Sequence, residues 1–283
     1  GGRMEERIQK PISARVGKRR NSLCKTAMEI IISQNPAEAS AKAAEAVKMQ
    51  IAAKRSSVLG LATGGTVLGL YENLVKMCAD GEISFKKIST FNLDEYVGIP
   101  ASDPNSYRSF MEDNLFSKIG IDRSNTHIPD GCAENVRAYC VQYENKIRLC
   151  GGIDLQLLGI GSDGHIGFNE PSSSLGSRTR VKTLTEKTRA DNSRFFGGDI
   201  SKVPMHAVTM GIGTILDSRE ILLLAFGEGK AEAVARMVEG PVTASVPASA
   251  LQLHPNVKVF LDEPAASKLE NKAYYKYVYA NKP

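Results

Sequence analysis

The chain alternates between short apolar runs and longer segments in which apolar residues return every three or four positions. The short runs carry little charge and little of the alternation seen in half-buried strands; they lie at Val58–Thr63, Ile88–Leu93, Ile153–Ile160, Ala207–Gly211, Ile221–Phe226 and Val257–Leu261. Such runs are typical of strands that are covered on both faces of a sheet. The sequence therefore predicts a sheet buried between two layers.

The longer segments have the spacing of amphipathic helices and lie at Pro36–Lys54, Val67–Ala79, Ser106–Lys118, Ala133–Leu149 and Gly229–Val238. In the second of them, Val67, Leu70 and Leu74 share one helical face. Because strands and helices alternate, the sheet is predicted to be mostly parallel, with crossover helices on both faces. We expect a doubly wound, Rossmann-like α/β fold that forms one domain over residues 23–283.

One segment breaks this alternation. Residues 171–203 are weakly apolar and rich in Ser, Thr and Arg. A segment of this length and composition favours a loop-rich lid over a strand of the sheet. We therefore expect a mobile lid at about 171–203.

Composition and charge narrow the function classes. Hydrophobic residues make up 42% of the 283 residues and charged residues 24%, which argues against disordered, collagen-like and coiled-coil proteins. The net charge of +5 suggests a nucleic-acid partner. However, seven basic and two acidic residues lie within residues 1–20, and the rest balances at 29 of each sign. We predict no nucleic-acid partner, and a basic leader, residues 1–22, that is disordered or partly a cloning remnant.

No apolar stretch approaches the roughly 18–20 residues of a membrane helix, and the leader lacks the apolar centre of a secretory signal. The five cysteines form no C-x-x-C pair and have no metal-type spacing with the four histidines. Reduced, structural thiols are the simplest interpretation. We expect a soluble, cytoplasmic protein that has no metal site and does not bind membranes.

The first candidate motif follows the run at Val58–Thr63. The run ends in Gly64, Gly65 and Thr66, directly before a predicted helix. Free N–H groups and the helix dipole at such a turn favour a phosphate. The motif lacks the P-loop lysine and the G-x-G-x-x-G spacing, so it gives little support for a nucleotide. A tight turn without a ligand is an equally good interpretation of this motif alone.

Acidic residues form the second motif. The run at Ile88–Leu93 ends in Asp94 and Glu95. Because ligands of doubly wound sheets bind at the carboxyl ends of strands, Asp94 is well placed for acid–base chemistry. The alternative is that Asp94 caps a following helix or turn.

The third motif is a glycine-rich segment after the run at Ile153–Ile160. It places Asp163, His165 and Glu170 within eight residues of one another. An imidazole flanked by carboxylates is a proton shuttle near neutral pH. A metal triad is the rival interpretation, but no second histidine lies nearby.

Two cations complete the candidates. Arg194 lies in N-S-R-F-F, and Lys230 lies at a predicted strand-to-helix junction. Either could complete an anion site begun by Gly64–Thr66. Taken alone, both are ordinary surface charges.

Together these segments resemble the glucosamine-6-phosphate deaminase (isomerase) family. The matching blocks run in order from about Val58 to about Glu263 and include T-G-G-T, T-F-N-L-D-E-Y-V-G-I, G-S-D-G-H-I-G-F-N-E-P, N-S-R-F-F and L-Q-L-H-P. The resemblance implies a reversible isomerisation with deamination, in which glucosamine 6-phosphate and water give fructose 6-phosphate and ammonia. It implies no cofactor.

The resemblance also implies a role for each candidate. Asp94 would carry a proton between carbons 2 and 1 of the open-chain sugar, and His165, oriented by Asp163 and Glu170, would open the ring. The phosphate would be held by Gly64, Gly65, Thr66, Arg194 and Lys230.

A second, allosteric site is implied for regulated members of the family, which are homo-oligomers. Its basic segment is matched here by Ser173, Arg180, Lys182 and Thr183, and its effector would be N-acetylglucosamine 6-phosphate. This chain departs from those members in two ways. It carries some two dozen residues ahead of the strand expected at Met28–Ile32, and it has no tryptophan near Val246.

Two other functions fit parts of the sequence. The first is a 6-phosphogluconolactonase, an enzyme that hydrolyses a lactone and that shares the expected fold and a block similar to G-x-x-D-G-H. The F-N-E-P continuation with Glu170 and the D-E-Y segment favour the deaminase. A sugar-phosphate sensor domain would need a DNA-binding module, which the leader is too short to hold.

Overall fold

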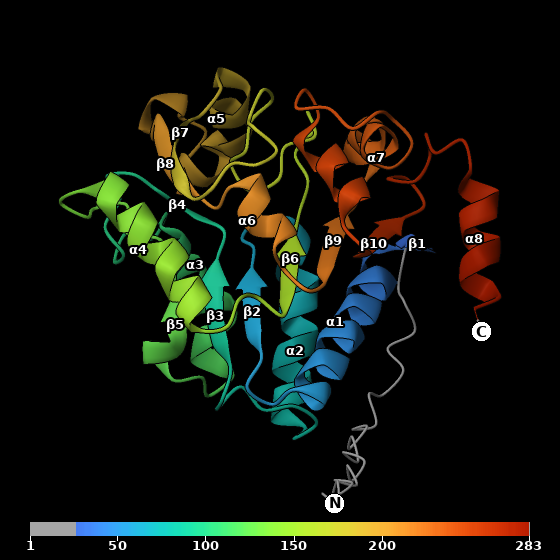
Figure 1. Ribbon diagram of the computed structural model, residues 1–283, viewed down its shortest axis with the longest axis horizontal. Helices are drawn as coiled ribbons and strands as arrows, with labels where there is room; N and C mark the ends of the chain where they lie inside the picture. Colours follow the sequence, from blue (N-terminus) through green and yellow to red (C-terminus); the bar gives the residue numbers. More distant parts are fainter. Residues whose placement is uncertain (1–26, 283) are drawn as a thin grey trace, which may run out of the picture.

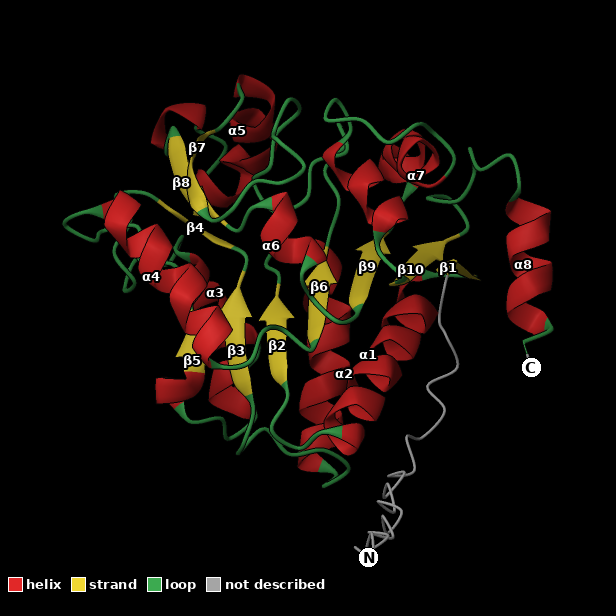
Figure 2. Ribbon diagram, in the orientation of Figure 1, coloured by secondary structure: helices red, strands yellow, loops and turns green. Residues whose placement is uncertain are grey.

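The computed structural model describes residues 27–282 (Figure 1). The predicted leader, residues 1–22, and the first four residues of the predicted domain lie outside the described part of the chain. Strands, helices and loops of the described part are distinguished by colour in Figure 2.

The core of the fold is a seven-stranded sheet in which every neighbouring pair of strands is parallel. Its strand order is β1 (Ala27–Ser33), β10 (Asn256–Asp262), β9 (Ile221–Ala225), β6 (Leu155–Leu158), β2 (Val58–Leu61), β3 (Ser89–Asn92) and β5 (Thr126–His127). Every residue of β2, β6 and β9 is buried, so both faces of the sheet are covered. The predicted doubly wound α/β architecture is confirmed.

The described part of the chain has eight α-helices: α1 (Pro36–Ala53), α2 (Leu68–Ala79), α3 (Tyr107–Asn114), α4 (Val136–Leu149), α5 (Glu186–Asn192), α6 (Ile212–Leu216), α7 (Ala231–Val238) and α8 (Lys272–Ala280). The five predicted helices correspond to α1, α2, α3, α4 and α7. Short 3-10 turns replace the predicted helix at the start of α2 and α7 and at the end of α3. The C-terminal helix α8 packs on the edge strand β1, away from the cavity (Figure 1).

A second, smaller sheet corrects two of the predictions. It is antiparallel, with the order β4 (Asp94–Tyr96), β8 (His206–Thr209) and β7 (Arg180–Thr183). The apolar run at Ala207–Gly211 therefore belongs to this sheet and not to the parallel one. The stretch 171–203 was expected to hold no sheet strand, yet it supplies β7. Because β7 is an edge strand with no fully buried residue, its sequence carries no apolar signal.

The small sheet has its own apolar cluster, separate from the main core. Its buried members are Tyr96, Phe168, Leu184, Phe196, Val203 and Ala207. Three of these six residues come from the stretch expected to be a lid. The lid segment is thus packed on the small sheet, above the carboxyl ends of the parallel strands (Figure 2).

Candidate active site

A cavity of about 510 Å³ lies where the parallel strands end. Residues directly after β2, β3, β6 and β9 line it, together with α3 and the segment that follows β7. This is the position at which doubly wound sheets bind their ligands, because the chain there is free to present side chains and backbone N–H groups.

Asp94 forms part of the cavity wall and is only 6% exposed. Burial, with a smaller contribution from the negative charge of Glu95, raises the pKa of Asp94 from 3.8 to about 8. A carboxyl group with a pKa near neutrality is suited to take up and return a proton. The neighbouring Gly167 leaves room for this group, since a Cβ atom there would lie 3.3 Å from Oδ2 of Asp94.

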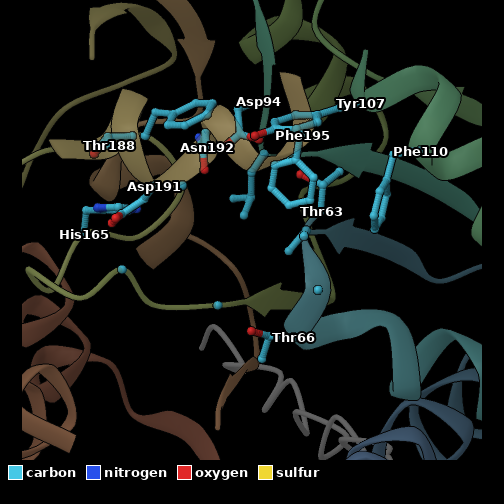
Figure 3. A pocket seen from close by; sticks show the side chains of 18 of the residues that line it. Thr63, Thr66, Asp94, Tyr107, Phe110, His165, Thr188, Asp191, Asn192 and Phe195 are labelled. Carbon is cyan, nitrogen blue, oxygen red and sulfur yellow. The ribbon is translucent and has the colours of Figure 1, made fainter. Parts of the chain in front are cut away.

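His165 lines the cavity at some distance from Asp94 in the view of Figure 3. Its Nδ1 lies 2.7 Å from Oδ1 of Asp163 and 3.8 Å from Oε2 of Glu170. The ring lies against the backbone of Gly161, where a Cβ atom would come within 2.2 Å of Cε1. Any side chain at position 161 would therefore displace the imidazole.

The carboxylates of Asp163 and Glu170 contact the imidazole but are not part of the cavity lining. Burial acts to raise the pKa of Asp163, but the hydrogen bonds and charge of His165 outweigh it and lower that pKa to about 2. Asp163 is therefore a permanent anion at neutral pH. Glu170 accepts hydrogen bonds from the N–H and hydroxyl of Thr185 through Oε1, while its buried Oε2 has no partner.

The same three side chains are the one group of possible metal ligands among residues 27–282, with ligand atoms within 4.8 Å of one another. The 2.7 Å separation of the imidazole nitrogen and the Asp163 oxygen is a direct hydrogen-bond distance. In this structure His165 and Asp163 therefore form a hydrogen-bonded dyad.

The residues predicted for the phosphate also line this cavity. Gly64, Gly65 and Thr66 follow β2 and form the 3-10 turn before α2, with Gly64 at a φ of +101°. Arg194 and Lys230 line the same cavity. Burial lowers the pKa of Lys230, which the charge of Asp191 partly offsets. The tertiary structure thus brings together all five residues predicted for the phosphate.

The predicted lid contributes Thr188, Asp191, Asn192, Arg194 and Phe195 to the cavity wall. Asn192 donates a hydrogen bond of 3.0 Å from Nδ2 to the hydroxyl of Tyr96. In the view of Figure 3, Asn192 and Phe195 appear near Asp94, whereas Asp191 appears next to His165.

The four residues of the predicted allosteric segment lie outside the cavity lining. Ser173 is buried in the turn after Glu170, and its hydroxyl has no partner. Arg180, Lys182 and Thr183 lie on β7. The guanidinium of Arg180 donates a 2.9 Å hydrogen bond to the side-chain oxygen of Asn169.

Several wall residues were not singled out from the sequence. Tyr96, Tyr107 and Phe110 line the cavity, and the rings of Tyr96 and Tyr107 pack against each other with centroids 5.1 Å apart. Tyr107 and Phe110 are labelled in Figure 3. Outside the lining, Asp262 accepts hydrogen bonds of 3.0 Å from the N–H of Gly227 and so holds the turn that carries Lys230. Tyr96 could have been noticed because it directly follows the D-E pair, but no local pattern distinguishes the other three.

No helix in the described residues is long and apolar enough to cross a membrane.

A buried carboxyl group, a carboxylate-bound histidine and two cationic side chains, all at the carboxyl edge of a parallel sheet, define an acid–base enzyme of the α/β class. A sequence profile described as glucosamine-6-phosphate isomerases/6-phosphogluconolactonase matches residues 33–260, and the chain belongs to this family.

Similar proteins have closely related sequences along nearly their whole length. A glucosamine-6-phosphate deaminase of Shewanella woodyi is 54% identical over 253 residues, which cover 89% of this chain and 96% of that protein. A glucosamine-6-phosphate deaminase of Streptomyces coelicolor is 52% identical over 256 residues, covering 90% and 98%.

Solved structures agree with this assignment. One described as a monomeric glucosamine-6-phosphate deaminase superposes with a TM-score of 0.83 at 47% identity, covering 85% of this chain and all of that one. The 6-phosphogluconolactonase of Trypanosoma cruzi superposes with a TM-score of 0.70 at 22% identity, covering 86% and 97%. The second likeness shows the fold alone.

Proposed function

We propose that the protein catalyses the reversible conversion of glucosamine 6-phosphate and water into fructose 6-phosphate and ammonia. The observation that carries this proposal is Asp94, a buried carboxyl group with a pKa of about 8 in a cavity that also holds His165 and two cationic side chains. An isomerase needs one group that both removes and returns a proton, and a carboxyl group with this pKa is suited to do so.

The first step assigned to the site is ring opening. His165 moves a proton from the anomeric hydroxyl to the ring oxygen, which breaks the bond between carbon 1 and that oxygen. The anion of Asp163, at 2.7 Å from Nδ1, fixes the orientation of the imidazole.

The second step is the proton transfer between carbons. The ionised carboxylate of Asp94 takes the proton from carbon 2 of the open-chain amino aldehyde and returns it to carbon 1, while the substrate's ammonium group gives up one proton and the aldehyde oxygen gains one. Carbon 2 is then doubly bonded to nitrogen, and water replaces this nitrogen to give the ketone and ammonia. The positive charge of the substrate's ammonium group favours the ionised form of Asp94 when the substrate binds.

The phosphate is assigned to the glycine-rich turn and the two cations of the cavity lining. Backbone N–H groups at Gly64–Thr66 and the side chains of Arg194 and Lys230 would hold it. A phosphate fixed there keeps carbons 1 and 2 at a constant distance from Asp94 and His165, which reduces the entropy lost on reaching the transition state.

The test is an assay of the purified protein for fructose 6-phosphate and ammonia, with glucosamine 6-phosphate and galactosamine 6-phosphate as parallel substrates. The matched control is Asp94→Asn, which keeps the size of the side chain and is expected to bind the substrate without turning it over. Release of ammonia together with fructose 6-phosphate from the glucosamine epimer is the expected result, whereas turnover of the galactosamine epimer would release ammonia together with tagatose 6-phosphate. Hydrolysis of 6-phosphogluconolactone in place of deamination would overturn the proposal.

We also propose a regulated homo-oligomer in which Ser173, Arg180, Lys182 and Thr183 bind N-acetylglucosamine 6-phosphate. Arg180 and Lys182 support this proposal, because residues two apart on β7 project from the same face of the strand. A lower KM in the presence of this effector, lost in Lys182→Ala, is the expected result. An unchanged KM, or a monomeric mass in light scattering, would contradict it.

We place the reaction in the cytoplasm. Cys78, Cys132, Cys140 and Cys150 form no disulfide in the described residues, which agrees with a reducing compartment.

A further inference from the structure

Glu95 directly follows Asp94 on β4, and its carboxylate is buried beneath the cavity wall, with 3% of the residue exposed. Successive residues of a strand project to opposite faces, so Glu95 points away from the space that Asp94 enters. Glu95 is not part of the cavity lining. A buried carboxylate next to the proposed base needs an explanation, because burying a charge is costly unless hydrogen bonds compensate.

The compensation comes from the first turn of α3. Oε1 of Glu95 accepts hydrogen bonds from the N–H groups of Tyr96 at 2.9 Å and Tyr107 at 3.0 Å, and Oε2 accepts one from Arg108 at 3.1 Å. The first N–H groups of a helix have no partner within the helix, and the positive end of the helix dipole attracts an anion there.

The N-terminus of α3 thus has two separate caps. Ser106 accepts a 3.0 Å hydrogen bond from the N–H of Ser109, the third residue of the helix. Glu95 serves the first two residues, which Ser106 does not reach. The two caps differ in one respect: only Glu95 brings a charge next to Asp94.

Helix α3 in turn forms part of the cavity. Tyr107 and Phe110 line it, and the Tyr107 hydroxyl lies 3.4 Å from the Tyr96 hydroxyl, which accepts the hydrogen bond of Asn192 from the lid. The position of the first turn of α3 therefore sets the position of these aromatic side chains in the cavity wall.

We propose that Glu95 is a positioning residue for the reaction: its carboxylate fixes the first turn of α3 against β4 and so sets both the cavity wall and the electrostatic surroundings of Asp94. The inference rests on the proposed deaminase function. The length and the charge of the Glu95 side chain should therefore have separate effects on the reaction. Glu95→Asp keeps the charge and shortens the side chain, whereas Glu95→Gln keeps the length and removes the charge.

The titratable groups near Asp94 determine how its pKa, and with it the pH dependence of the reaction, responds to a substitution. The titratable groups that interact with its charge are Glu95 and Tyr96 on its own strand, Tyr107 on α3 and Tyr143 on α4. Burial raises the pKa of all three tyrosines, so they stay neutral over the working range. Burial raises the pKa of Glu95 itself, and the N–H groups of the first turn of α3 together with the charge of Arg108 oppose this rise. Among the neighbouring groups, Glu95 is the negative charge that adds to the effect of burial on the pKa of Asp94.

The experiment compares the pH dependence of kcat/KM for the wild type, Glu95→Gln, Glu95→Asp and the charge-neutral control Ser106→Ala. The acid limb of this profile follows the ionisation of Asp94. In Glu95→Gln we expect this limb to move toward lower pH by about one unit, because a like charge next to Asp94 is removed and its pKa falls. Glu95→Asp should keep the acid limb and lower kcat roughly tenfold, because the shorter side chain loses part of the α3 contacts. Ser106→Ala should leave the acid limb in place because it removes no charge, and it is compared on the limb alone, since Ser106 also caps α3 and lines the cavity.

The inference would be overturned if both Glu95 variants kept the acid limb of the kcat/KM profile and the kcat of the wild type. It would also be overturned if the acid limb of Ser106→Ala moved as far as that of Glu95→Gln. If the Glu95 variants do not fold, Arg108→Met supplies the test: the positive charge of Arg108 opposes the raised pKa of Glu95, so its loss leaves a larger share of Glu95 protonated and should move the acid limb toward acid pH. An unmoved limb in that variant would overturn it. Absence of deamination by the wild type would instead refute the proposed function.

Discussion

The raised pKa of Asp94 has a consequence for stability that is independent of the assignment of the reaction. The folded protein keeps a proton on Asp94 up to a pKa of about 8, whereas the ordinary value is 3.8. Between these two pH values the unfolded chain has released a proton that the folded protein still binds. The free energy of unfolding therefore falls as pH rises through this window.

The substitution Asp94→Asn removes this dependence, because the amide has nearly the shape of the protonated acid and does not titrate. Each pH unit within the window corresponds to about 1.4 kcal/mol. Between pH 5 and pH 7 the wild type should therefore lose roughly 2–3 kcal/mol relative to the variant. The variant is expected to be inactive and, at pH 7, more stable than the wild type.

Equilibrium unfolding in urea at pH 5, 6 and 7, followed by circular dichroism, measures this difference. Asp113→Asn is the matched control, since Asp113 is an exposed carboxylate on α3 and its removal should leave the pH dependence unchanged. Curves of stability against pH that run parallel for the wild type and Asp94→Asn would refute the reasoning. They would mean that Asp94 is ionised in the folded protein at neutral pH.

Replacing Lys230 with alanine should raise KM for glucosamine 6-phosphate roughly tenfold to a hundredfold, with a smaller effect on kcat, because one charge-assisted hydrogen bond to the phosphate is lost. An unchanged KM in steady-state kinetics would remove Lys230 from the site. Asp262→Asn should raise KM in the same direction but less, because the Gly227 turn loses its anionic acceptor; an effect on kcat alone would contradict this. His165→Gln should slow the closed-ring substrate more than an open-chain analogue, and equal losses would count against ring opening.

Much of this fold could be predicted from local pattern. The runs that became β2, β6, β9 and β10 are apolar because strands covered on both faces exclude charge, and this requirement is visible without knowledge of their neighbours. The glycines at 64 and 161 and the close spacing of Asp163 and His165 are also local, since residues so near in sequence meet in almost any turn. The candidate dyad could therefore be found before any coordinates.

Other features depended on contacts between distant segments. The run at Ala207–Gly211 has the composition of a central strand, but it lies in the antiparallel sheet, where β4 and β7 bury it. Arg194 and Lys230 are 36 positions apart in the chain and share one cavity only because the lid folds back over the end of β9.

The chemistry of Asp94 shows the same division. Its place after an apolar run marks it as a candidate in the sequence, yet the sequence assigns no proton affinity to it. That affinity depends on burial against Gly167 and on the charge of Glu95, which the first turn of α3 holds in place from a dozen residues away. Sequence pattern determined which residues could do the chemistry, and only tertiary packing decided the solvent exposure and neighbouring charges that suit them to it, because both depend on segments brought together from across the chain.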